Sequence, residues 1–119
     1  MRYLITGHTG FVGSSFCKIL INKSKNSEFI LVARRTNKEF LGLKNVSQVN
    51  YDLTQNFNFE LLRKVDFFLN FAGEIRSEEK MFDLHVVFLQ KCFNFIKLNN
   101  LKLYWVQLSS VGSYGNPTH

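Results

Sequence analysis

The chain has 119 residues, of which 45% are hydrophobic and 20% are charged, and this composition excludes a disordered chain, a coiled coil and a collagen-like sequence. Lysine and arginine number 15 against 9 acidic residues, a net charge of +6, but their scattered placement favours a solvated surface, so we expect no nucleic-acid partner. No apolar run nears the roughly 18 residues of a membrane span, and the N-terminal run is too short for a signal peptide. We therefore expect a cytoplasmic protein without a membrane partner.

Apolar spacing predicts strands and helices that alternate along the chain. A short apolar strand at 3–6 leads into a glycine-rich turn, and helical spacing follows over 11–23. The continuous apolar run 29–33 has the length of a strand. Further along, the pattern predicts a weaker strand at 46–51, a short helix at 57–64, a strand at 66–70, a long helix at 77–98 and a strand at 103–108.

The clearest of these strands are almost wholly apolar, which is typical of parallel strands covered by helices on both faces. Right-handed crossovers then give a doubly wound parallel sheet with the strand order 3-2-1-4-5. We therefore predict one α/β domain of the Rossmann type over residues 1–119.

The two cysteines, Cys17 and Cys92, both lie in segments with apolar helical spacing. A cysteine in such a segment behaves as a small buried hydrophobe, and a disulfide between the two is the less favoured alternative. Neither has a close partner at zinc spacing, so we expect no metal site.

The glycine-rich turn is the strongest functional signal in the sequence. Residues 6–13 read TGHTGFVG, with three glycines spaced three apart between a strand and a helix. Gly7 can form the tight turn, Gly10 can let the backbone approach a pyrophosphate, and Gly13 can let the helix pack on the sheet. The free N–H groups at the helix start would then bind phosphates. The alternative is that the glycines serve packing alone. His8 lies within this turn, and we expect its side chain to point outward.

With this spacing the sequence resembles the short-chain dehydrogenase/reductase superfamily, and in particular its extended branch of NAD(P)-dependent sugar-nucleotide epimerases, dehydratases and reductases. The resemblance extends over the whole chain. It implies that the turn binds a dinucleotide cofactor through residues Thr6, Gly7, Thr9, Gly10, Phe11, Val12 and Gly13.

The residues after the second strand bear on the choice of cofactor. NAD-specific members of the family usually carry an acidic residue there, whereas this sequence has Ala33, Arg34 and Arg35. A guanidinium can offer two donors to a 2′-phosphate, so we expect NADP to be favoured over NAD. The alternative is that one or both arginines face solvent.

Two further positions match cofactor-binding positions of the family. After the third strand, Asp52 would accept a hydrogen bond from the adenine amino group, and Leu53 would flank the ring. After the fourth strand, the family's alanine–glycine motif is matched by Phe71, Ala72 and Gly73. Small residues there leave room for the cofactor, and the preceding Asn70 is expected to be structural rather than catalytic.

The resemblance implies that Ser110, in the segment SSVGSYG, is the catalytic-site serine that hydrogen-bonds the reacting substrate oxygen. The family also needs a tyrosine with a lysine four residues later, on a following helix. None of the four tyrosines has a lysine at that distance, and the sequence ends at His119. We therefore expect either a truncated enzyme, lacking the sixth strand and the substrate lobe, or a stand-alone half, and no substrate turnover by these residues alone.

The predicted long helix carries apolar residues on more than one face from Met81 to Ile96. Such a helix must bury more than its contact with the sheet. Similar proteins dimerise through this helix, so we expect a homo-oligomer. The leading functional hypothesis is the NAD(P)-binding portion of an epimerase, dehydratase or reductase acting on a nucleotide-activated sugar. The alternatives are a non-catalytic NADP-binding regulatory domain and a purely structural interaction domain.

Overall fold

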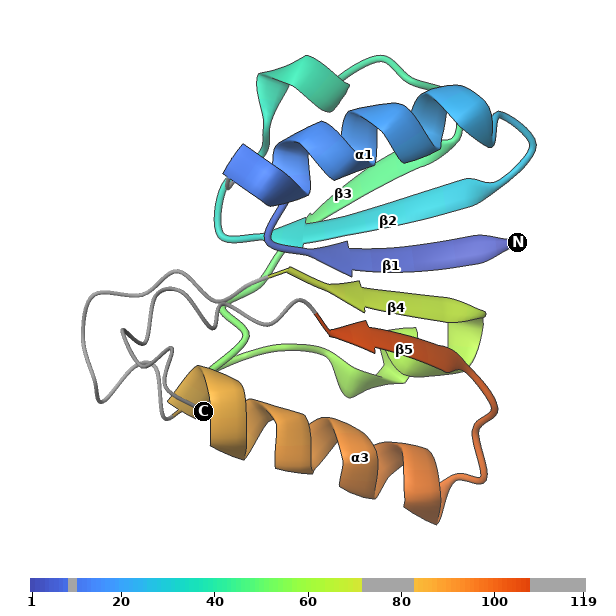
Figure 1. The fold of residues 1–119 in the computed structure, drawn as a ribbon. Coiled ribbons are helices and arrows are strands. Elements are labelled where there is room, and N and C mark those ends of the chain that lie inside the picture. Colours follow the sequence, from blue (N-terminus) through green and yellow to red (C-terminus); the bar gives the residue numbers. More distant parts are fainter. Residues whose placement is uncertain (9–10, 72–82, 108–119) are drawn as a thin grey trace, which may run out of the picture.

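The protein is built on a five-stranded parallel sheet, seen in a computed structural model that describes residues 1–8, 11–71 and 83–107 (Figure 1). The strand order is β3-β2-β1-β4-β5, which confirms the predicted doubly wound topology. The strands are β1 (Arg2–Thr6), β2 (Glu28–Ala33), β3 (Val46–Asn50), β4 (Phe67–Asn70) and β5 (Tyr104–Gln107).

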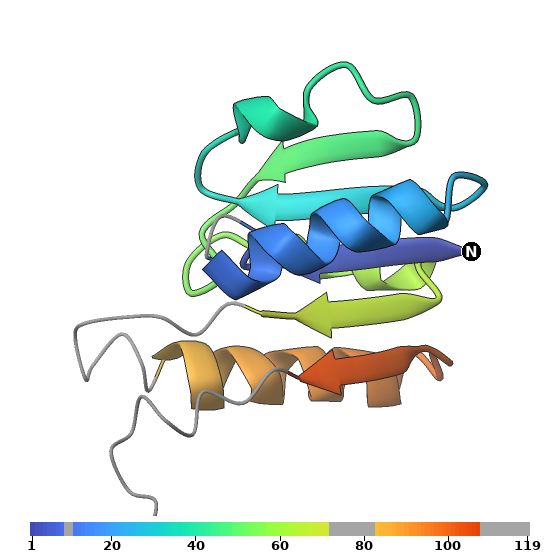
Figure 2. The same cartoon turned by 45° about the horizontal axis from the view of Figure 1, so that its top comes forward.

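The helices cover both faces of this sheet. Helix α1 (Phe11–Lys23) lies on one face and helix α3 (Leu89–Leu98) on the other (Figure 2). Helix α1 has the predicted bounds and turns Cys17 and Ile21 toward the sheet, where both are buried. None of the helices in the described ranges is long and apolar enough to cross a membrane.

Three shorter helical segments differ from the sequence-based expectations. The helix predicted at 57–64 is a 3₁₀ helix, η2 (Phe59–Lys64), and an additional 3₁₀ turn, η1 (Lys38–Phe40), follows β2. Of the long helix predicted at 77–98, the described residues form the π-helical segment η3 (Asp83–Phe88) and then helix α3, and residues 77–82 lie outside the described ranges. An asparagine side chain caps each 3₁₀ segment, because Asn37 and Asn58 accept hydrogen bonds from backbone N–H groups two residues on.

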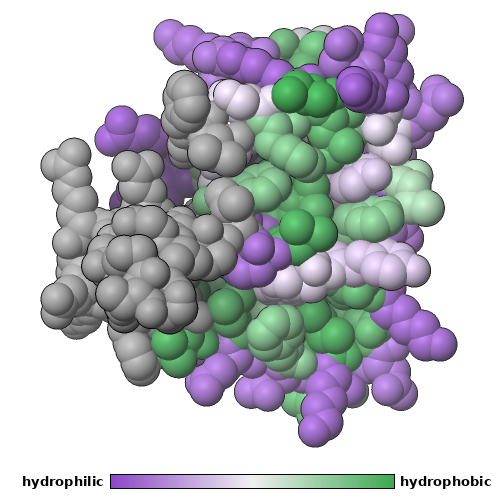
Figure 3. Space-filling view, in the orientation of Figure 1, coloured by the Kyte–Doolittle hydropathy of each residue, from purple (hydrophilic) through white to green (hydrophobic). Residues whose placement is uncertain are grey.

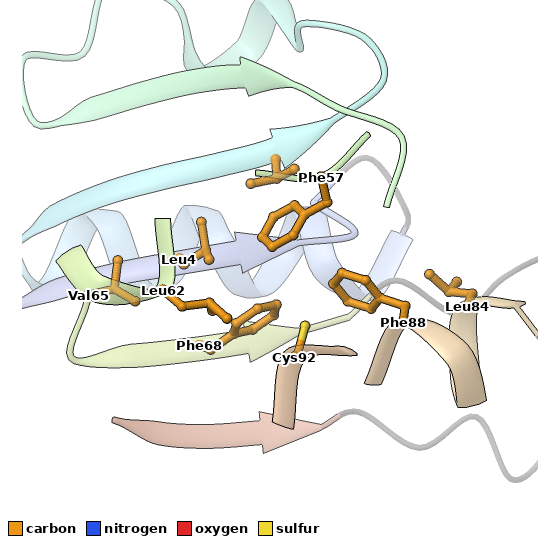
Figure 4. Packing of buried hydrophobic residues seen from close by; sticks show 9 residues of the cluster. Leu4, Phe57, Leu62, Val65, Phe68, Leu84, Phe88 and Cys92 are labelled. Carbon is orange, nitrogen blue, oxygen red and sulfur yellow. The ribbon is translucent and has the colours of Figure 1, made fainter. Parts of the chain in front are cut away.

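Alternation along the strands divides the interior into two cores. Leu4 of β1 belongs to the core under α3, and its neighbour Ile5 belongs to the core under α1. Figure 4 shows the first core, in which Phe68 and Phe88 come from the sheet and from η3. Each fully buried side chain of this size stabilises the fold by about 1.5–3 kcal/mol.

A row of stacked aromatic rings crosses the sheet on the α1 side. Neighbouring strands align Phe29 with Tyr3, Tyr3 with Phe67, and Phe67 with Tyr104, and successive ring centroids are 5.1, 4.9 and 5.2 Å apart. Below α1 in Figure 3, apolar and weakly polar residues cover the middle of this face, with hydrophilic residues above and below. Tyr104 and Val106 of β5 are exposed there.

Candidate nucleotide-binding site

The predicted cofactor-binding residues that the structure describes gather at one edge of the sheet. Parallel strands bring their carboxyl ends to the same edge, and in Figure 1 the arrowheads point to the side on which α1 begins. The residues at this edge, in chain order, are Thr6, Gly7, Gly13, Arg34, Arg35, Asp52, Leu53 and Phe71. Outside the described residues are Thr9, Gly10, Ala72, Gly73 and Ser110, and of Phe11 and Val12 only the backbone is described.

The glycine turn has the geometry expected of its first and third glycines. Gly7 has a φ of +77°, a left-handed conformation that favours glycine. A Cβ added at Gly13 would lie 2.1 Å from the carbonyl oxygen of Gly7 and 3.3 Å from the Cβ of Phe71. Helix α1 therefore approaches the end of β1 so closely that only glycine fits at position 13.

A buried hydrogen-bond network ties the ends of β1, β4 and β5 together. The hydroxyl of Thr6 donates to Oδ1 of Asn70 at 2.5 Å, and Nδ2 of Asn70 donates to Oε1 of Gln107 at 2.9 Å. The indole N–H of Trp105 donates to the same oxygen at 3.1 Å. These contacts favour the structural role expected for Asn70. Sequence reasoning missed Gln107, because nothing in a strand pattern indicates which neighbouring strand a polar side chain will reach.

His8 is buried rather than directed outward, so the prediction for this side chain is wrong. It is 1% exposed, and its ring meets Phe40 edge-on at a centroid distance of 5.8 Å. Within the described part of the chain, neither ring nitrogen has a hydrogen-bond partner. Burial lowers the pKa of His8 from its usual 6.5, and nearby Gln48 offsets this only in part.

The loop after β2 is held in place by side chains of β3. The amide of Gln48 accepts from the backbone N–H of Asn37 at 2.8 Å and donates to its carbonyl oxygen at 3.0 Å. Asn50 donates to the carbonyl oxygen of Ala33 at 3.2 Å. Arg34 and Arg35 are exposed on the loop between these two anchors.

Asp52 organises the turn after β3. Its Oδ1 accepts hydrogen bonds from both the backbone N–H of Thr54, at 2.9 Å, and the hydroxyl of Thr54, at 2.7 Å. Its own backbone N–H donates to Oδ1 of Asn56 at 2.7 Å. The neighbouring Leu53 packs against the core under α3. The turn thereby fixes both residues at the sheet edge.

Phe71 closes the edge at β4. Its backbone N–H donates to the carbonyl oxygen of Thr6 at 3.0 Å, and its ring meets Phe16 of α1 edge-on at 5.1 Å. The first turn of α1 leaves backbone N–H groups without intrahelical partners, and these suit an anion. These free N–H groups, and the close approach of α1 to β1 at Gly13, suit the phosphates of a dinucleotide. Among the described residues, no group of three or more His, Cys, Asp or Glu could hold a metal ion.

Comparison with known proteins confirms the resemblance seen in the sequence. The model of the NAD dependent epimerase/dehydratase family matches residues 3–119. No curated protein matches the chain.

Three similar solved structures share the fold. A dTDP-glucose 4,6-dehydratase from Bacillus anthracis, in complex with NAD, is 24% identical with a TM-score of 0.74, over 92% of this chain and 37% of that one. A UDP-glucuronic acid 4-epimerase from Bacillus cereus, in complex with NAD, is 17% identical with a TM-score of 0.79, over 99% and 43%. The Bordetella bronchiseptica enzyme WbmG, in complex with NAD and UDP, is 17% identical with a TM-score of 0.73, over 100% and 40%. The chain thus spans less than half the length of these proteins.

The predicted preference for NADP over NAD is contradicted by these comparisons, because the similar structures named above are complexes with NAD. The prediction rested on Arg34 and Arg35 as partners of a 2′-phosphate. In the structure both arginines are exposed on the loop after β2. A solvated guanidinium at this place does not require a phosphate partner.

Proposed function

Because the chain belongs to the NAD dependent epimerase/dehydratase family, we propose that residues 1–119 form the NAD-binding portion of an enzyme that acts on a nucleotide-activated sugar. The observation that carries the proposal is the contact between Gly7 and Gly13, where an added Cβ would lie 2.1 Å from a carbonyl oxygen. Packing this close places the N-terminus of a helix directly after a strand, where phosphate groups bind.

Each part of the dinucleotide has proposed partners at the sheet edge. The turn would hold the pyrophosphate through Thr6, Gly7, Thr9, Gly10, Phe11, Val12 and Gly13. Arg34 and Arg35 would border the adenosine ribose, and Asp52 and Leu53 would contact adenine. Residues 71–73 would line the cofactor's backbone. The bound nicotinamide supplies the hydride chemistry, and Ser110 would hydrogen-bond the reacting substrate oxygen.

Support for the substrate class comes from the similar structures. They include a dehydratase of a dTDP-sugar and an epimerase of a UDP-sugar, the latter also solved with a UDP-sugar analogue. The test is a titration of the NAD⁺-loaded protein, with a substrate lobe included, with UDP-glucose, dTDP-glucose and free glucose, followed by NMR. We expect shifts with the nucleotide sugars only, and a smaller response after Ser110→Ala. Equal responses to all three sugars would contradict the substrate class.

Cofactor binding is tested by calorimetric titration of the chain with NAD⁺, NADH and ADP-ribose. We expect saturable binding by the wild-type chain and loss of binding in Gly13→Ala. Gly42→Ala is the control for the general effect of replacing a glycine, because nothing lies within 4 Å of an added Cβ there and its φ of +80° supplies backbone strain without a clash. If Gly42→Ala loses binding equally, the effect is general destabilisation. Unchanged binding by Gly13→Ala contradicts the site.

We also propose self-association through the helical segment from Met81 to Ile96, in the reducing environment of the cytoplasm. Phe93 and Val86 are 49% and 38% exposed on the described part of this segment. Phe93→Ser should lower the weight-average mass measured by sedimentation. Phe16→Ser is the control, since Phe16 is a similarly exposed phenylalanine on α1. An unchanged mass in Phe93→Ser, or an equal drop in both variants, contradicts this interface.

A further inference from the structure

His8 is a buried polar side chain that the cofactor-binding scheme leaves without a role. The ring is 1% exposed, and both nitrogens lack hydrogen-bond partners among the described residues. A buried polar group without a partner is unfavourable, because it has given up its hydrogen bonds to water. Buried polar groups without a partner are rare in folded proteins. His8 directly follows Gly7 of the glycine turn.

The ring connects the glycine turn to the elements that hold the loop after β2. Phe40, which meets His8 edge-on at 5.8 Å, is 3% exposed and belongs to the core under α1. Gln48 lies near the ring without meeting the geometry of a hydrogen bond to it, and its amide is paired to the backbone of Asn37. A movement of His8 would therefore disturb both Phe40 and Gln48, and with them the loop that carries Arg34 and Arg35.

The elements around His8 carry few charged side chains in the described part of the chain. Strand β3 (Val46–Asn50) has no titratable side chain. Segment η1 carries Lys38 and Glu39, and the carboxylate of Glu39 forms an ion pair with Lys18 of α1. The loop before η1 adds only the two exposed arginines, Arg34 and Arg35.

We infer that His8 is a positioning residue, which in its neutral form holds the loop after β2 against the glycine turn, so that dinucleotide binding weakens when His8 is protonated. The nucleotide part of this inference rests on the proposed function. The chemistry is the gain of one proton by the imidazole from solvent, which requires the ring to leave its apolar contact with Phe40.

The sign of the pH dependence follows from burial. The pKa of His8 in the folded chain is lowered from the usual 6.5, so the unfolded chain takes up the proton first as the pH falls. The contribution of His8 to stability is therefore present above pH 6.5 and is lost as the pH falls toward the folded-state value. One proton changes the unfolding equilibrium constant by up to about tenfold per pH unit in this interval.

The experiment compares the wild-type chain with His8→Leu, which fills a similar space and cannot titrate. Urea unfolding and the NAD⁺ dissociation constant are measured from about pH 8 to about pH 5.5, and NMR follows the His8 ring. We expect a steeper loss of stability and of NAD⁺ affinity with falling pH in the wild-type chain, by up to about tenfold per pH unit in each constant. His119→Gln, which removes a different histidine, should behave as wild type.

Three results would overturn the inference: a His8 ring that titrates at or above pH 6.5, a His8→Leu variant with the wild-type pH dependence, or a His119→Gln variant that loses it. Failure of NAD⁺ to bind even at about pH 8 overturns the proposed function instead, together with the nucleotide part of the inference. In that case the unfolding curves and the NMR titration still decide whether neutral His8 holds the loop to the turn.

Discussion

Asn70 shows how one side chain can join three strands at a binding edge. It accepts from Thr6 of β1 and donates to Gln107 of β5. Asn70→Ala would leave these buried groups without their partner, so we expect a loss of about 1–3 kcal/mol in the free energy of unfolding. Urea denaturation measures it, with Gln55→Ala in an exposed turn as the control. A loss no larger than in the control would mean that the network adds no stability.

The two cysteines show how burial sets reactivity at the residue scale. Cys17 and Cys92 are free and buried, and desolvation raises the pKa of each thiol to about 12. Because the thiolate is the reactive form, both should react with a disulfide reagent far more slowly in the native chain than in denaturant. The number of cysteines that have reacted with the reagent, followed over time, measures this. Rapid native reaction of either cysteine would contradict its burial.

At the scale of an element, the two faces of the segment that includes α3 contribute very different amounts to the free energy of unfolding. Phe88, at the end of η3, is 1% exposed in the core, whereas Phe93 of α3 is 49% exposed and touches Trp105 at a ring distance of 4.9 Å. Phe88→Ala should cost about 3–5 kcal/mol of unfolding free energy because it leaves a cavity. Phe93→Ala should cost about 1 kcal/mol, the value of one aromatic contact. Equal losses in thermal or urea unfolding would contradict this difference in packing between the two faces.

Sequence patterns predicted the strands better than the helices. The apolar runs at 29–33 and 66–70 were readily predicted as strands, since a parallel strand covered on both faces is almost wholly apolar. The type of each short helix was not predictable, because 3₁₀, α and π geometries differ by one residue in hydrogen-bond spacing and share apolar patterns. Packing against the sheet decides between them.

In the candidate site, the features that depend on neighbouring residues were predictable from the sequence, and those that depend on distant residues were not. The conformations at Gly7 and Gly13 follow from motif spacing, which is local. The packing of His8 on Phe40 and the pairing of Gln48 with Asn37 join residues that are 32 and 11 positions apart, so the sequence pattern could not reveal them. The predicted preference for NADP rested on two arginines after β2 and is contradicted by the similar structures in complex with NAD.

At the scale of the whole molecule, two cores share one sheet. Leu4 and Ile5 are adjacent in β1 and contribute to opposite cores, so neither core can be lost without exposing the other. We expect a single unfolding transition. Trp105, the one tryptophan in the sequence, packs on Phe68 with ring centroids 4.2 Å apart, so its fluorescence should change together with far-ultraviolet circular dichroism. Separate midpoints would show that the cores unfold independently.

The strand order also has a consequence for synthesis on the ribosome. β1 is the central strand and is made before both of its neighbours, β2 and β4. Leu4, which is fully buried in the finished fold, gains its full cover only when the chain has grown past Phe68 and through η3, whereas Ile5 can be covered earlier by α1 and β2. The nascent chain therefore carries one edge and one face of β1 uncovered until β4 and η3 are made, and this interval is when chaperone binding would matter most.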